Sequence, residues 1–171
     1  MKINTKKLSA ALPRVAFSIC LAASCAVAQP AGEKPNWLNT REVLNYPLTM
    51  ESIDKWAGAT RGMITYTKAH PEILAKIQLV NNEPAQKTVD DLVTLAKTKA
   101  GEYVAIVESN GIKFREYLLV SGAVITAKVA VDFGGNPGLI NPANIAFLET
   151  NRAKMDALFA EYESLAKGGS K

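Results

Sequence analysis

Residues 114–133 read FREYLLVSGAVITAKVAVDF, and this stretch decides the fold. Between Glu116 and Lys128 every residue is apolar or small. A helix that is apolar on all sides lies in the interior, surrounded by other elements. The eleven residues between these two charges are too few for a bilayer span, which needs roughly 20. The stretch therefore predicts the central helix of a bundle.

The same stretch leaves a strand-containing α+β fold open as an alternative. It is rich in β-branched residues, which favour strands. Strict alternation of apolar and polar residues is absent, however, and the run continues for a long distance without a turn. Both features favour a helix.

Signals for helix starts surround the central stretch. Thr49 is a predicted N-cap, and Leu48 and Ile53 are spaced to pack across it. Trp56 and Met63 continue the helical spacing of a segment over 50–69. Further helices are expected at 71–80 after His70-Pro71, at 88–99 with Thr88 as its cap, and at 142–167. A short helix is also expected at 102–109, where the β-branched residues leave a strand open as the alternative. The fold class is therefore all-α, a single-domain bundle of five or six helices.

The amino terminus has the features of an export signal. Lys2, Lys6, Lys7 and Arg14 precede an apolar run that ends at Ala26-Val27-Ala28. Small residues at Ala26 and Ala28 suit a signal peptidase, so we expect cleavage before Gln29. The chain then divides into a signal peptide (1–28), an N-terminal spacer (29–47), a helical domain (48–167) and a flexible tail (168–171). No transmembrane segment is expected after cleavage.

Cys25 offers a second interpretation of this terminus. Ala22-Ala23-Ser24-Cys25 is similar to a lipoprotein box, although Leu21 stands one place too early for it. In that case the protein would be a lipoprotein anchored through Cys25. In the first interpretation both Cys20 and Cys25 are removed, and the mature chain has no disulfide.

Removal of the signal changes the charge balance. Four of the 20 Lys and Arg residues lie in the signal, which leaves 16 against 16 acidic residues and a net charge of zero. A neutral domain without a basic face is not expected to bind nucleic acid.

The residues that could support catalysis or metal binding are few. His70 is the only histidine, and it is best explained as a helix boundary before Pro71. With no mature cysteine, the usual zinc ligand sets cannot be assembled. Neither a nucleophile motif nor a phosphate-binding loop is present. We therefore assign no catalytic residue, no metal ligand and no cofactor.

Two motifs stand out as candidate sites. Arg115-Glu116-Tyr117 and Asn141-Pro142-Ala143-Asn144 are each explained as helix starts, with Glu116 and Asn144 reaching back toward the backbone. Arg115 could instead pair with an acid across the bundle. A cleft between helices, with Arg115 at its mouth, is a second interpretation, and its lining would come from Trp56, Met63, Phe114 and Tyr117. The same four side chains would otherwise fill the core.

At these motifs the sequence resembles a loosely defined group of small exported bacterial proteins. The matching stretches are Leu48-Thr49-Met50, Arg115-Glu116-Tyr117 and Asn141-Pro142-Ala143-Asn144. Members often have Thr-Pro before the Arg-Glu pair, whereas this chain has Lys113-Phe114. The resemblance implies an all-helical fold over 48–165 and supplies no catalytic residues.

These observations predict a periplasmic or secreted protein. The preferred function is that of a non-catalytic helical binding or scaffold protein of the cell envelope. The alternatives are a carrier of a small apolar or amphipathic ligand and, least favoured, an enzyme. Its partner would be an envelope protein or a small apolar ligand.

Overall fold

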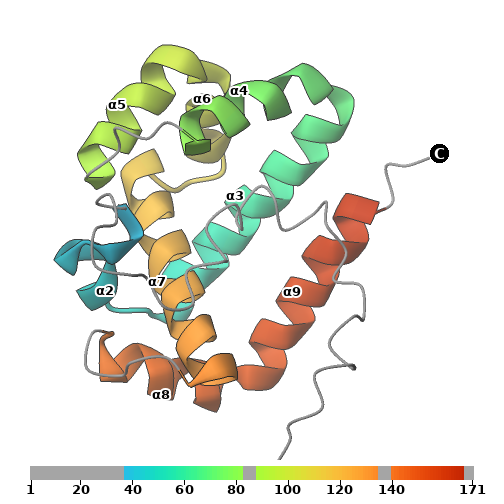
Figure 1. Cartoon of the computed structure of the whole chain (residues 1–171). Coiled ribbons are helices and arrows are strands. Elements are labelled where there is room, and N and C mark those ends of the chain that lie inside the picture. The colour runs from blue at the N-terminus through green and yellow to red at the C-terminus, as the bar shows by residue number, and fades with distance from the viewer. Residues whose placement is uncertain (1–36, 83–87, 135–139, 168–171) are drawn as a thin grey trace, which may run out of the picture.

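The computed structural model describes residues 37–82, 88–134 and 140–167. The signal peptide, its cleavage site, Cys25 and the tail lie outside these residues. The elements are η1 (Trp37–Asn39), α2 (Arg41–Asn45), α3 (Met50–Ala69), α4 (Pro71–Asn82), α5 (Val89–Lys99), α6 (Gly101–Ser109), α7 (Phe114–Phe133), α8 (Pro142–Thr150) and α9 (Arg152–Lys167) (Figure 1). All regular structure in the described ranges is helical. The predicted all-α class is confirmed.

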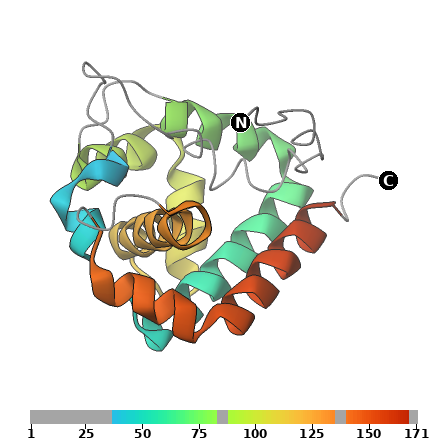
Figure 2. The ribbon, with the colours of Figure 1, turned by 60° about the horizontal axis from the view of Figure 1, so that its bottom comes forward.

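Helix α7 lies at the centre of the bundle, as its apolar sequence predicts. Figure 2 shows α7 nearly end-on, with the other helices arranged around it. Helices α2, α3, α5, α6 and α8 all pack against it. Its middle is fully buried at Val120, Ala123, Val124 and Ala127. Burial of these aliphatic groups is the main force that holds the surrounding helices in place.

The predicted N-caps of α3 and α5 are present. The Thr49 hydroxyl accepts a hydrogen bond from the Ser52 N–H at 3.1 Å, and the Ser52 hydroxyl accepts one from the Thr49 N–H at 3.0 Å. Thr88 and Asp91 form the same reciprocal box on α5. Each box satisfies N–H groups that a helix start leaves without partners.

The segment expected as one helix over 142–167 forms two helices. Asn151 separates α8 from α9. Its side-chain amide donates to the Phe147 carbonyl at 2.8 Å, and its own N–H donates to the same oxygen at 3.0 Å. The Asn151 backbone lies at φ −105° and ψ 19°, outside the helical region, and this interrupts the helix at one residue. Helix α9 then packs along α3 at the edge of the bundle (Figure 1).

The folded part of the described chain begins earlier than expected. Residues 37–45 fall within the stretch 29–47 that the sequence interpretation treats as a spacer. In the structure they form η1 and α2, which pack on α7 and bury Leu38 and Val43. The segment is too short to show a periodic pattern, so its sequence alone does not reveal it. The described ranges therefore contain eight α-helices and not five or six.

Candidate functional site

The four residues proposed to line a cleft are core residues. Trp56, Met63, Phe114 and Tyr117 each expose at most 2 % of their surface. Phe114 and Tyr117 stack with their ring centroids 6.3 Å apart, and Tyr103 of α6 meets Phe114 edge-on at 4.8 Å. Contacts of this kind fill space between helices. The alternative that these side chains fill the core is therefore the one observed.

Trp56 belongs to a second aromatic group, formed with α9. Its ring meets Tyr162 edge-on at 5.7 Å and Phe159 at 6.5 Å. The indole N–H donates to the Ser121 hydroxyl at 2.8 Å, and that hydroxyl donates to the Tyr117 carbonyl at 2.7 Å. The Ser121 hydroxyl thus offsets the cost of burying the Trp56 N–H, because it provides that group with a hydrogen-bond acceptor.

Arg115 pairs with acids from two other helices. Its Nε donates to Asp90 at 2.8 Å, and its Nη2 donates to Glu42. The hydrogen bond from Arg115 lowers the pKa of Asp90 below its usual range. Because Arg115 remains 42 % exposed, its side chain lies at the surface and not at the mouth of an internal cleft. The alternative that Arg115 pairs with an acid across the bundle is the one observed.

The start of α7 differs from its expected form. Lys113 makes no side-chain capping bond, and the Phe114 N–H donates to the Glu108 carboxylate at 3.3 Å. The sequence interpretation proposes that Glu116 caps this helix. In the structure the cap comes instead from Glu108, at the end of α6. A residue six positions earlier lies outside the spacing of a capping box.

Asn141 begins α8 as predicted. Its side-chain oxygen accepts from the Ala143 N–H at 3.0 Å, and Pro142 occupies the first helical turn. Its backbone N–H donates to the Leu44 carbonyl at 3.0 Å. The motif thus caps α8 and also holds the C-terminal end of α2.

Asn144 has a role that the capping interpretation misses. It is 1 % exposed, and its amide does not turn back to its own helix. Its oxygen accepts from the Leu48 N–H at 2.9 Å, and its nitrogen donates to the Tyr46 carbonyl at 2.7 Å. These two bonds fix the extended link between α2 and α3. Sequence offers no signal for them, because they join positions almost 100 residues apart.

His70 ends α3 as expected. Its ring stacks on Tyr66 with centroids 4.2 Å apart, and its Nδ1 lies 3.4 Å from a Glu72 oxygen. Its charged neighbour is thus Glu72, whereas Arg115 engages Glu42 and Asp90. His70 and Arg115 therefore do not form one site.

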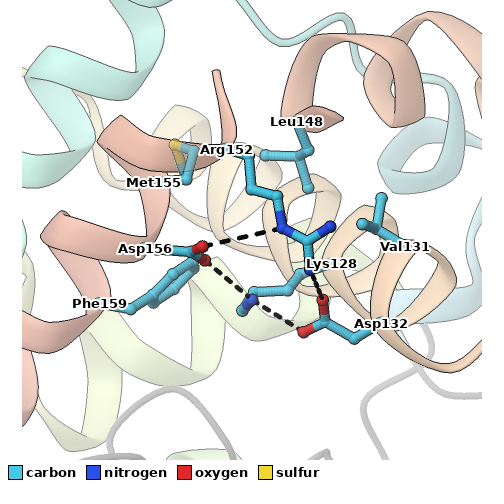
Figure 3. Close-up of a pocket in the computed structure, with 8 residues that line it drawn as sticks. All are labelled: Lys128, Val131, Asp132, Leu148, Arg152, Met155, Asp156 and Phe159. Atoms are coloured by element: carbon cyan, nitrogen blue, oxygen red, sulfur yellow. Dashed lines mark hydrogen bonds and ion pairs between the residues drawn. The ribbon is translucent and has the colours of Figure 1, made fainter. Parts of the chain in front are cut away.

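A small pocket lies between α7, α8 and α9 (Figure 3). Lys128 of α7 contacts Asp132 at 2.8 Å and Asp156 at 3.6 Å, and Arg152 lies 3.9 and 3.8 Å from the same two acids. The Lys128 ammonium also lies 5.1 Å from the centre of the Phe159 ring, a cation–π distance. The space suits a water molecule. These balanced charges join α7 to α9.

Two further observations concern the described residues as a set. No three of their acidic, histidine or cysteine side chains come together in a way that would hold a metal ion. None of the helices in these ranges is both long and apolar enough to cross a membrane.

Comparison with protein-family models, curated proteins and solved structures found no match to this chain. The resemblance to a group of small exported proteins stays a prediction.

Proposed function

We propose that this protein is an exported, non-catalytic helical binding or scaffold protein of the cell envelope, and that it binds through its outer surface. The observation that carries the choice of surface over interior is the burial of Trp56, Met63, Phe114 and Tyr117. A carrier needs these side chains to face a space for its ligand. Packed against one another and against Tyr103 and Tyr162, they instead support a solid core.

Two other features support this proposal. The export signal directs the mature chain out of the cytoplasm. Outside the cytoplasm, a neutral domain would meet envelope components. His70 and Arg115 are the side chains that the sequence analysis considered for chemistry. They have separate partners on separate helices. An acid–base mechanism requires such groups to converge on one reacting atom.

The test separates a surface binder from a carrier. The mature protein is isolated from the envelope or extracellular fraction and examined by native mass spectrometry for a retained small ligand. In parallel, a photo-crosslinking residue is placed at exposed positions on different helices. We expect a ligand-free mass and a protein adduct that forms from one face. A stoichiometric lipid or other apolar ligand, displaced by Trp56→Ala, would support the carrier instead.

A further inference from the structure

Helix α6 ends at Asn110-Gly111, the one Asn-Gly pair in the sequence. Asn110 is exposed, and its backbone leaves the helix at φ −93° and ψ 15°. Gly111 follows at φ 82°, in the left-handed region that favours glycine. Asparagine is a chemically labile residue, because the next backbone nitrogen in the chain can attack its side-chain amide carbon. A following glycine has no Cβ to hinder that attack.

The reaction at such a pair is a deamidation. The Gly111 nitrogen would lose its proton and form a bond to the Asn110 Cγ, and the side-chain nitrogen would leave as ammonia. The product of this step is a cyclic imide. Water then opens the ring at one of its two carbonyl groups, which leaves either aspartate or isoaspartate. Water is therefore the only co-reactant, and nothing is oxidised or reduced.

Two hydrogen bonds hold the reacting groups in place. The Asn110 Nδ2 donates to the Ile106 carbonyl at 2.8 Å. The Gly111 N–H, which must lose its proton before the attack, donates to the Glu108 carbonyl at 3.1 Å. Both bonds must break before the ring can close. The last turn of α6 thus slows the reaction without preventing it, since helix ends fray.

Helix α3 supplies a third restraint. It packs against α6, and Gly62 faces the amide of Asn110. A Cβ atom added at Gly62 would lie 2.5 Å from the Asn110 Nδ2 and 3.0 Å from both its Cγ and its Oδ1. The bare backbone at Gly62 therefore leaves room for the whole amide group. A methyl group there would displace the amide from its position against the Ile106 carbonyl.

We propose that Asn110 is a site of spontaneous covalent modification, converted slowly to aspartate or isoaspartate in the folded protein. Its rate is set by the fit of its amide against Gly62 and the end of α6. The modification needs no partner, so it does not depend on the binding function proposed above.

The modification also changes the structure around it. The new carboxylate cannot donate to the Ile106 carbonyl. It adds a negative charge at the C-terminal end of α6, beside Glu108, where the helix dipole disfavours one. Isoaspartate further lengthens the backbone between α6 and α7. Conversion is therefore expected to loosen the end of α6 and its contact with α3.

The experiment follows conversion in the full mature chain, incubated at mildly alkaline pH and sampled over time. Peptide mapping by mass spectrometry locates the replacement of an amide by an acid, and an isoaspartate methyltransferase assay detects the second product. Asn45 is the internal control. Its exposed amide also donates to the carbonyl four residues earlier, at 2.9 Å, but the bulky Tyr46 follows it. Conversion should appear at Asn110 well before Asn45, and equal rates at the two residues would overturn the proposal.

Two glycine substitutions on α3 form a matched pair. Gly62→Ala places a methyl group against the Asn110 amide, whereas Gly58→Ala places one in open space. We expect Gly62→Ala to convert Asn110 about fivefold faster than the wild type, the factor that corresponds to one lost hydrogen bond of about 1 kcal/mol. Gly58→Ala should match the wild type. Circular dichroism verifies that each variant keeps its helices, and equal rates in the two variants would contradict the role of Gly62.

The wild type alone provides a further test, which stands even if Gly62→Ala fails to fold. In guanidinium chloride the restraints are lost, so Asn110 should convert faster than in the folded chain. Equal rates in the two conditions would show that the fold does not set the rate. A folded chain that stays intact over many half-times of the unfolded one would show that Asn110 is not a modification site. Asn110→Asp then tests the consequence, as faster hydrogen exchange at residues 106–111.

Discussion

The amide of Asn144 satisfies two backbone groups that would otherwise lose their partners inside the protein. Leu48 N–H and the Tyr46 carbonyl lie in an extended link that makes no helical hydrogen bonds there. An unsatisfied buried polar group costs about 1–3 kcal/mol. One side chain therefore decides whether the α2–α3 link can lie against α8.

Asn144→Ala is expected to lower the free energy of unfolding by about 2–3 kcal/mol, because both backbone groups lose their partner. Urea denaturation monitored by circular dichroism measures this loss. Asn45→Ala is the matched control, since its exposed amide bonds only to the Arg41 carbonyl one turn earlier. The control should stay within about 0.5 kcal/mol of the wild type. Equal losses in the two variants would show that the Asn144 bonds do not matter.

Ser121 gives a second test at this scale. Ser121→Ala leaves the buried Trp56 N–H without its acceptor and should cost about 2 kcal/mol in urea denaturation. In the background Trp56→Phe, which has no N–H to satisfy, the same substitution should cost much less. A double-mutant cycle isolates this coupling. Additive effects would mean that the hydrogen bond contributes nothing.

At the scale of elements, the sequence predicted α3, α4, α5, α6 and α7 close to their observed bounds, and its errors lie at α2 and at the break between α8 and α9. The cap at Thr49 and the helical spacing placed α3 at its observed bounds, and the apolar run placed α7, although its expected cap is absent. Helix α2 went unpredicted because five residues carry no period, and it is held by packing on α7, where Val43 lies against Gly122. The break falls at Asn151, a single residue whose backbone, at φ −105° and ψ 19°, leaves the helical region. Apolar spacing continues across the break, so the pattern alone predicts one helix.

The same limit applies to the candidate site. Sequence identified Arg115 and the Asn141–Asn144 motif as worth attention, but capping did not account for the contacts of Asn144 or Arg115. Their partners Tyr46, Leu48, Glu42 and Asp90 come from distant parts of the chain. Pairing across such distances depends on how helices pack, which local patterns do not contain.

The contact between α3 and α9 should make the free energy of unfolding depend on pH. Arg61 donates to both oxygens of Glu161, at 2.6 and 2.8 Å, and these hydrogen bonds lower the pKa of Glu161. A carboxyl group with a lowered folded-state pKa stabilises the fold above its unfolded pKa. That contribution is lost as the pH falls through the folded pKa.

Glu161→Gln should therefore be less stable than the wild type at neutral pH, and the gap should close as the pH falls well below about 4. Urea denaturation at several pH values measures both chains. Glu149→Gln is the control, because Glu149 is exposed and forms no ion pair with the other described residues. A gap between wild type and Glu161→Gln that persists unchanged in acid would contradict the assignment.

At the scale of the whole molecule, two interpretations of the amino terminus give different proteins. Cleavage before Gln29 gives a free, cysteine-free chain whose net charge is zero, since 20 − 4 = 16 basic residues balance 16 acidic ones. Lipidation at Cys25 would give an anchored protein. Only eight residues, 29–36, separate Ala28 from Trp37, so the choice also decides how near the membrane η1 and α2 would be held.

We predict cleavage before Gln29, because small residues at Ala26 and Ala28 fit the pockets of a signal peptidase. Two variants of the full precursor separate the interpretations. Ala28→Leu should block processing and leave the precursor mass, whereas Cys25→Ser should leave the mature mass and the fractionation unchanged. Intact mass spectrometry of the envelope and soluble extracellular fractions measures both. If Cys25→Ser instead releases the protein from the membrane fraction, and the wild-type mass includes acyl chains, the lipoprotein interpretation is correct.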